Sequence, residues 1–268
     1  MKPIRRLGEA SDGLKDYLAG DGEQANWKGF RSHQGGEAYQ ELVQVLYHIQ
    51  HGLCGYCEIN IIPRDKQVEH VVPRSHSLQG KAGELDPANM MLCCQGGTCL
   101  NNDNERRRKN DNERKRKPIK GNCSCGQAKG NSVDPQFIDP RDLPPLPSLV
   151  RVDDEGKISA DEDACTDARI DVSRVEKTIQ ILGLNIERLR RARRKHWDAL
   201  NDNLKEYFDN PNIINMMNKD IINMMKKAAR GELLPGKDGR LPPFFSTSRS
   251  YFGPVAEEIL AEAPQKWI

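Results

Sequence analysis

The sequence predicts an α+β protein in which a small cysteine-bearing core with short strands is flanked by helices on both sides. Three observations lead to this prediction. Apolar residues recur at helical spacing in 36–50 and again in 173–208. The run "QVEHVV" at 67–72 is rich in β-branched residues and stops at a proline, as a strand does. Seven of the eight cysteines lie between residues 54 and 125, which marks a compact core there.

The composition is that of a polar chain with a modest core. Charged residues make up 30% of the 268 residues and hydrophobic residues 37%. This length allows one sizeable core with an appendage, or two small domains. No apolar run approaches the roughly 20 residues that a membrane span needs, and the first residues, "MKPIRRLGEASDG", contain no apolar signal segment. We therefore expect a cytoplasmic protein with no membrane partner.

Three regions follow one another along the chain. Residues 1–52 form an N-terminal helical lead-in, with a short helix and loops up to residue 35, then a helix over 36–50 that Gly52 ends as a C-cap. Residues 53–145 form the cysteine-bearing core. Residues 146–268 form a mostly helical C-terminal region.

The core region is expected to contain a hairpin and a basic insertion. The hairpin runs through "EINIIPRDKQVEHVV" at 58–72. The insertion, 98–122, contains a tandem duplication, "NDNERRRK" followed by "NDNERKRK", and residues 101–120 hold nine Lys or Arg against four Asp or Glu. Such a segment cannot pack a core. It suits either a polyanion such as nucleic acid or a solvated loop, and composition leaves both open.

The C-terminal region is expected to begin with a hairpin at 150–160 and then become helical. Ser173 and Glu176 form a capping box for one helix, which Gly183 ends, and Asn185 caps the next. "IINMM" occurs at 213 and 221, two helical turns apart, so the copies share a face. This methionine stripe and the aromatic cluster of 244–252 suit either a core or a docking surface for a partner.

The cysteines have the spacing of a zinc site. Two thiolates separated by two residues on a tight turn, as in "CGYC", reach one tetrahedral zinc, and "LCC" at 92–94 and "CSC" at 123–125 offer two more ligands. The predicted ligands are Cys54, Cys57, Cys94 and Cys125, with Cys93 and Cys123 as the alternative choice within the last two groups. Cys99 and Cys165 are expected to be spare or buried thiols.

The order of these motifs resembles a known family. C-x-x-C, then "EHVVPRS", then Asn89 before "CC", then Cys-x-x-x-Lys-Gly resembles the zinc-bearing HNH endonucleases. The segments "MKPIRRLGEA", "LCCQGG" and "TIQILGLNIERLRRARRK" extend this resemblance. With them, the chain is similar over most of residues 1–200 to the HNH proteins of retron and Septu antiphage systems, the PtuB-like group. The resemblance implies a ββα-metal core that binds one catalytic Mg²⁺ or Mn²⁺ and cuts nucleic acid.

The resemblance also implies roles for particular residues. His70 would be the general base, Glu69 a ligand of the catalytic metal, and Asn89 the residue that fixes the loop and orients the His70 ring. The family usually places a His or Asn ligand just after the last cysteine, where this chain has Gly126, so Gln127 or Asn131 is expected to substitute. Arg74 and Lys129 are expected to contact phosphate.

Two functions and several partners are therefore expected. The first function is a metal-dependent endonuclease acting in antiphage defence beside a PtuA-like ABC/SMC-type ATPase, and in a retron also beside a reverse transcriptase and its RNA. The alternative is a zinc-stabilised nucleic-acid-binding or scaffold module with a degenerate nuclease site, which Gly126 favours.

Overall fold

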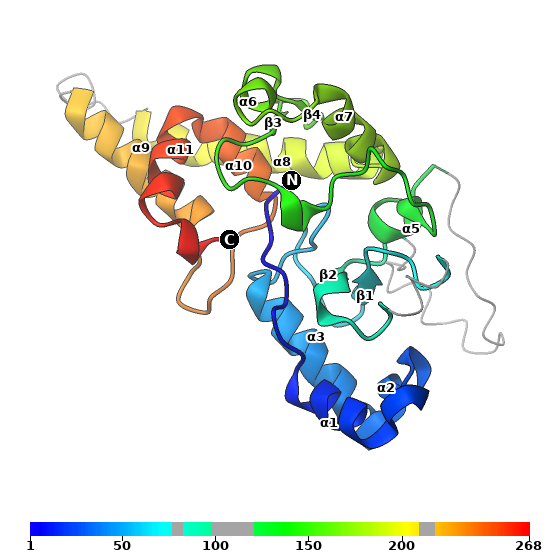
Figure 1. Cartoon of the computed structure of the whole chain (residues 1–268). Coiled ribbons are helices and arrows are strands. Elements are labelled where there is room, and N and C mark those ends of the chain that lie inside the picture. The colour runs from blue at the N-terminus through cyan, green and yellow to red at the C-terminus, as the bar shows by residue number, and fades with distance from the viewer. Residues whose placement is uncertain (77–82, 98–120, 209–217) are drawn as a thin grey trace, which may run out of the picture.

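The computed structural model describes residues 1–76, 83–97, 121–208 and 218–268 of the chain (Figure 1). Its described elements are helices and two small antiparallel sheets, so the predicted α+β class is confirmed. The predicted basic insertion falls largely on 98–120, and the first "IINMM" copy on 213–217; both lie outside the described residues. In the described part of the chain, no helix is both long enough and apolar enough to cross a membrane.

Three helices form the N-terminal part. They are α1 (Asp12–Asp21), α2 (Trp27–Ser32) and α3 (Glu37–Ile49). The predicted helix over 36–50 is thus confirmed, and its apolar face is buried: Leu42 and Leu46 have no exposed surface. Both α1 and α2 pack on α3. The chain turns sharply between α2 and α3 through Gly36, whose φ of 95° suits a residue without a Cβ.

The first sheet pairs β1 (Gln67–His70) with β2 (Met90–Cys93) in antiparallel register, with Glu69 opposite Met91 and His70 opposite Met90. The predicted hairpin through 58–72 is therefore wrong. Residues 58–65 make only isolated bridges, and the partner of β1 comes some twenty residues later along the chain. All four residues of β2 are buried, so burial of this apolar run decides the pairing. The short helix α5 (Cys125–Lys129) lies beside this sheet.

The second sheet is the predicted hairpin at 150–160, with β3 (Val150–Val152) paired to β4 (Ile158–Ala160). Helices α6 (Glu162–Asp167), α7 (Val172–Ile181) and α8 (Glu187–Phe208) follow. The predicted N-caps of α7 and α8 are wrong. Asp171 caps α7 by accepting from the Ser173 amide, and the Asn185 side chain bonds both backbone groups of Ile158 instead of capping α8. Asn185 thus bonds a strand whose proximity the local sequence does not reveal.

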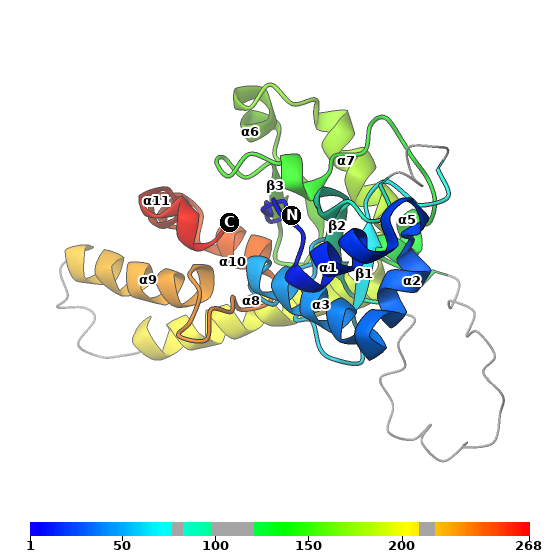
Figure 2. The ribbon, with the colours of Figure 1, turned by 60° about the horizontal axis from the view of Figure 1, so that its bottom comes forward.

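The C-terminal helices form a second hydrophobic cluster. They are α9 (Asn218–Leu233), α10 (Phe245–Phe252) and α11 (Pro254–Glu262). In both views α9 and α11 lie together, away from α1 and α2 (Figures 1 and 2). Phe244, Phe245 and Phe252 are buried, so these three aromatic residues belong to the core. The second "IINMM" copy lies on α9, where Ile222 is exposed.

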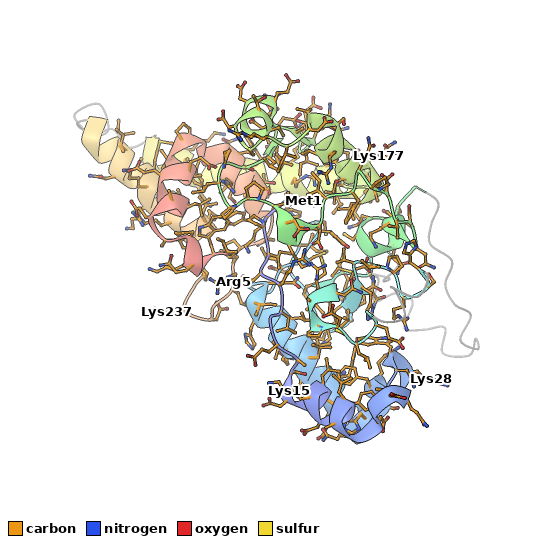
Figure 3. The ribbon with its side chains drawn as sticks, in the orientation of Figure 1. Met1, Arg5, Lys15, Lys28, Lys177 and Lys237 are labelled. Carbon is orange, nitrogen blue, oxygen red and sulfur yellow. The ribbon has the colours of Figure 1, made fainter. Side chains whose placement is uncertain are left out.

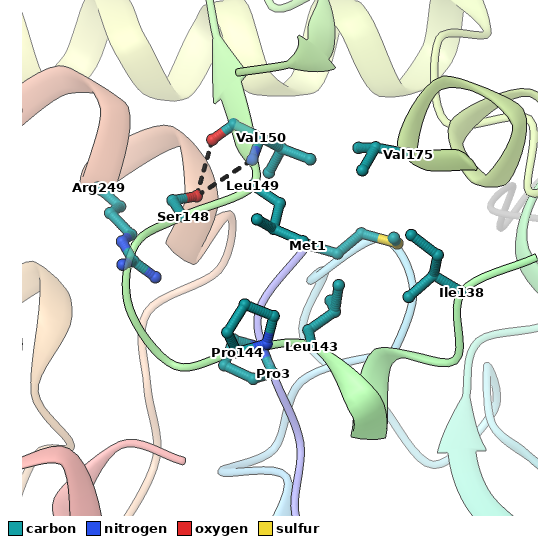
Figure 4. A pocket seen from close by; sticks show the side chains of 10 residues that line it. All are labelled: Met1, Pro3, Ile138, Leu143, Pro144, Ser148, Leu149, Val150, Val175 and Arg249. Carbon is teal, nitrogen blue, oxygen red and sulfur yellow. Dashed lines mark hydrogen bonds between the residues drawn. The ribbon is translucent and has the colours of Figure 1, made fainter. Parts of the chain in front are cut away.

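The first hydrophobic cluster extends from Met1 to Leu189 and includes residues from all three predicted regions; the division at 52 and 145 stays a prediction. The N-terminal segment lies within this packing. Figure 4 shows Met1 extended toward Ile138 and Val175, with Pro3 beside Pro144. The cavity that these residues line has a volume of about 10 Å³, which is room for about one water molecule. It is therefore a small packing gap in the core and not a ligand site.

Candidate active site

Four cysteines meet at one buried point. Their ligand atoms lie within 4.8 Å of one another, with Cys94 Sγ 3.7 Å from Cys57 Sγ and 3.6 Å from Cys125 Sγ. Four sulfur atoms around a tetrahedral zinc at about 2.3 Å would be roughly 3.8 Å apart. The cluster therefore has the size of a zinc site, and its members are Cys54, Cys57, Cys94 and Cys125.

The chemistry of this cluster also fits a cation. All four thiols are buried, and burial raises the pKa of Cys125 well above its usual value. Four adjacent thiolates in an apolar interior need positive charge, which a bound Zn²⁺ would supply. Cys93 is not part of the cluster: it lies on β2 and its Sγ accepts from Gln67 Nε2 at 3.4 Å.

His70 is the last residue of β1 and lies largely buried against α2. Its Nε2 is 2.9 Å from the carbonyl oxygen of Glu84, and the Trp27 ring packs edge-on against the imidazole with ring centroids 4.5 Å apart. Because a carbonyl only accepts, Nε2 carries the proton and Nδ1 keeps a lone pair. Burial lowers the pKa of His70 to about 4, so the ring is neutral at pH 7.

Glu69 points to the other face of β1, toward α5. Its Oε1 accepts from Tyr56 Oη at 3.3 Å and is 3.4 Å from Lys129 Nζ, and both the Glu69 and Lys129 side chains are largely buried. Burial raises the pKa of Glu69, and the Lys129 ammonium partly opposes this shift. Glu69 Oε2 lies against Gly126, because a Cβ built on that glycine would come within 2.4 Å of it.

Asn89 closes the loop between β1 and β2. Its Oδ1 accepts from the Val72 amide at 2.8 Å, and its Nδ2 donates to the carbonyl oxygens of Val72 and Gly83 at 3.0 and 3.1 Å. These bonds hold together the two ends of the loop on which Glu84 lies. Asn89 thus bonds the loop backbone, while the contact that orients the His70 ring comes from the Glu84 carbonyl.

The remaining predicted site residues are spread around this centre. Gln127 is exposed and donates to Gln67 at 3.4 Å, on the strand face that Glu69 also uses. Asn131 is exposed, past the end of α5. Lys129 lines a pocket of about 230 Å³ with Asp139 and Arg174. Arg74 is exposed, its guanidinium 5.8 Å from the centroid of the Trp27 ring.

Several residues that contact the site were not singled out from the sequence. Trp27 packs on His70, Tyr56 bonds Glu69, and Gln50 bonds the backbone of β2. Tyr56 lies within the C-x-x-C turn, and this position gives a signal that its hydroxyl is near the site. Trp27 and Gln50 give no such signal, because their proximity depends on how α2 and α3 pack.

Some basic residues of α8 bond to groups within the protein. Arg193 is buried and donates to the carbonyl oxygens of Gly156 and Leu184, and Arg188 donates to Ser124 beside the cysteine cluster. Arg191, Arg194 and Lys195 remain exposed.

Comparison with known proteins gives one informative match. A protein of Escherichia coli named "Retron Ec83 putative HNH endonuclease" is 30% identical over 217 residues, which span 73% of this chain and 78% of that protein. No family model matches the chain. The match spans more than two thirds of each protein, so the two belong to one family.

Proposed function

The chain belongs to the HNH endonuclease family, and we propose that it is a metal-dependent endonuclease that hydrolyses phosphodiester bonds of nucleic acid. The observation that supports this most directly is the pair of neighbours at the end of β1. Glu69 and His70 present a carboxylate and a neutral imidazole to opposite strand faces, and Glu69 lies against Gly126, which follows the cluster cysteine Cys125.

His70 is the proposed general base. Its Nε2–H is held by the Glu84 carbonyl, so Nδ1 is the atom that takes a proton from the attacking water. The water oxygen forms a bond to phosphorus as the bond to the leaving 3′ oxygen breaks. Trp27 holds the ring edge-on and excludes solvent from one side, which keeps the imidazole in one orientation.

Glu69 is the proposed ligand of the catalytic cation. A hard ion such as Mg²⁺ or Mn²⁺ is commonly held by one or two carboxylates together with water and substrate phosphate, so a single buried carboxylate fits. Such a cation supplies positive charge to the phosphate and to the leaving oxygen. Gln127 and Asn131 are the proposed sources of an amide ligand, and Gln127 already lies on the Glu69 face of β1. Lys129 is proposed to contact phosphate from beside Glu69.

Zinc in the four-cysteine cluster has a structural role in this proposal. It would join the C-x-x-C turn to the end of β2 and to the start of α5, and so fix Gly126 against Glu69. The ββα-metal arrangement of the family is thus proposed for β1, β2 and α5.

The biological setting is proposed from the relative and from the resemblance in sequence. The name of the relative mentions a retron, which supports action beside a reverse transcriptase and its RNA in antiphage defence. A PtuA-like ATPase is the proposed partner in a Septu setting, and both settings place the protein in the cytoplasm.

The nuclease proposal is tested by cleavage of plasmid DNA and of total tRNA by wild type and His70→Ala, with Mg²⁺, with Mn²⁺ and without divalent ions. We expect wild type to cut with metal and His70→Ala to lose at least about a hundredfold, the usual contribution of a general base. His76→Ala is the matched control, since His76 is an exposed histidine on the following loop.

Zinc content is measured for all three proteins and should be equal. A wild type that binds nucleic acid but cuts none of these substrates, even beside a PtuA-like ATPase, would instead support the binding or scaffold module with a degenerate site.

A further inference from the structure

A basic pocket borders Trp27, whose ring also packs against His70, the proposed general base. It has a volume of about 420 Å³ and is lined by Trp27, Lys28, Arg31 and Ser32 of α2 and by Arg74 of the loop after β1. Trp27 itself is buried, with 6% of its surface exposed, so its ring forms a wall and is not free to stack on a base. The same indole thus contacts His70 and borders the pocket.

The three cations of this pocket lack a compensating carboxylate. Lys28, Arg31 and Arg74 are exposed, and none of them lies within 4.0 Å of an acidic oxygen belonging to the described ranges of the chain. Two of them rest on aromatic rings: the Arg31 guanidinium is 5.3 Å from the Tyr39 centroid, and that of Arg74 is 5.8 Å from the Trp27 centroid. Stacking of this kind orients a guanidinium and leaves its N–H donors available to an anion.

Positive charges gathered in one hollow repel one another and raise the local concentration of anions. The arrangement suits a ligand with several acceptor oxygens, since an arginine offers five donors in a fork that matches a phosphate. Two segments distant in sequence, α2 and the loop after β1, supply the cations. The loop after β1 leads directly from His70.

From these observations we propose that the pocket of Lys28, Arg31 and Arg74 binds the phosphodiester backbone of the substrate next to the phosphate that is cut. The inference rests on the proposed nuclease function and adds α2 to the substrate-binding surface. Trp27 links the two, because its ring contacts both the His70 imidazole and the Arg74 guanidinium.

The test measures binding separately from cutting. All binding variants carry His70→Ala. Binding is measured by the fluorescence anisotropy of a short fluorescein-labelled oligonucleotide, which is prepared as single-stranded DNA, as duplex DNA and as RNA, over a range of salt concentrations. We expect Lys28→Ala/Arg31→Ala to weaken binding about tenfold at low salt. The slope of log K against log salt should fall by about 1.4 to 1.8, because each phosphate contact contributes about 0.7 to 0.9.

Two further variants separate a local effect from net charge. Lys227→Ala/Lys237→Ala removes the same charge from exposed lysines of the C-terminal part, and should leave affinity and slope unchanged. Lys28 and Lys237 lie at different sides of the molecule in Figure 3. Lys28→Arg keeps the charge and should bind like the parent. Equal melting temperatures show that each variant is folded.

The outcomes distinguish the two proposals. If wild type cuts nucleic acid and Lys28→Ala/Arg31→Ala binds as tightly as the parent, or the control pair weakens binding equally, the pocket inference is overturned and the nuclease function stands. If the parent binds no form of the oligonucleotide and wild type cuts nothing, both fail. The form of oligonucleotide whose binding responds most to the α2 variant identifies the substrate.

Discussion

At the scale of single residues, the space beside Glu69 explains a departure from the family pattern. A Cβ at Gly126 would lie 2.4 Å from Glu69 Oε2 and 2.9 Å from its Cδ, closer than real atoms approach. The sequence alone presents this glycine as a missing metal ligand. The structure shows that the absent side chain leaves room for the carboxylate that we propose as the ligand.

Gly126→Ala should therefore displace Glu69 from Tyr56 and Lys129. We expect a destabilisation of about 1–3 kcal/mol, the usual cost of an added methyl group in a packed site, and a loss of cleavage of about tenfold or more at unchanged zinc content. Ala128→Ser, an exposed change on the same helix, is the control. Cleavage rates and thermal unfolding measure both effects. Higher activity of Gly126→Asn would contradict this account and support a lost ligand.

Lys2 is a buried cation whose effect on the stability of the fold should depend on pH. The residue is 3% exposed, its Nζ donates to the Pro3 carbonyl, and burial lowers its pKa from 10.5 to about 7. Between these two values the unfolded chain binds the proton and the folded chain does not, so this residue makes stability rise with pH over that window. Below pH 7 the ammonium is charged in both states and its burial penalty is fully present.

Lys2→Met should consequently stabilise the protein most at pH 6, by a few kcal/mol, since one pKa unit corresponds to about 1.4 kcal/mol. The advantage should shrink as the pH rises from 7 toward 10.5. Urea unfolding at several pH values measures it. Lys237→Met, an exposed change, should show no such trend, and an advantage of Lys2→Met that grows with pH would refute the argument.

At the scale of elements, the sequence predicted what a local pattern can determine. The helix at 36–50, the hairpin at 150–160 and the glycine at 183 that ends α7 are all confirmed. The partner of β1 and the N-caps of α7 and α8 were predicted wrongly. The partner of β1 and the bonds of Glu176 and Asn185 depend on segments that are remote in the chain, whereas α7 is capped by the nearby Asp171. Polar side chains such as Asn185 bond where the packing brings a free backbone group, and periodicity carries no information on that choice.

Gln50 is the clearest example of a contact between elements. It is 1% exposed at the end of α3, and its Nε2 donates to the carbonyls of Leu53 and Leu92 at 2.9 and 2.7 Å. Its Oε1 accepts from the Leu92 amide at 2.6 Å. One side chain thus joins α3 to the cysteine turn and to β2.

Gln50→Met keeps the approximate volume but removes these bonds from the Leu53 carbonyl and the Leu92 amide, while the Leu92 carbonyl still accepts from the Gly55 amide at 3.1 Å. Each unsatisfied buried group costs about 1–3 kcal/mol, so we expect a destabilisation of about 2 kcal/mol or more. Gln44→Met, an exposed change on the same helix, should cost little. Denaturant unfolding measures both variants, and a Gln50→Met protein as stable as wild type would show that water replaces the side chain.

At the scale of the whole molecule, the candidate site could be predicted only in part. The spacing of the cysteines indicated four ligands, and the order of motifs indicated Glu69, His70 and Asn89. The contribution of α2 could not be predicted, because Trp27 lies more than forty residues before His70 and reaches it only through the packing of α2 on α3. Short local motifs identify a site, whereas the surfaces around it depend on the complete fold.

The cysteine cluster also lies where the two hydrophobic clusters meet. Cys54 and Cys57 belong to the first, and the neighbouring Leu53 belongs to the second, which includes Trp267. Glu58, one residue past the cluster, accepts from the Ser246 amide at 2.7 Å. Loss of zinc should therefore loosen both ends of the molecule.

We expect Cys57→Ser or a strong chelator to lower the melting temperature by about 10 °C or more, because structural zinc contributes many kcal/mol and each kcal/mol shifts the midpoint of a domain this size by about 2–4 °C. A variant with Trp27 as its only tryptophan reports unfolding of the first hydrophobic cluster by fluorescence, and one with only Trp267 reports unfolding of the second. Loss of zinc should lower the melting temperature of both clusters together. Cys165→Ala, a buried thiol outside the cluster, should keep its zinc. A transition of Trp267 that stays in place while that of Trp27 falls would mean that the C-terminal helices fold independently of the metal.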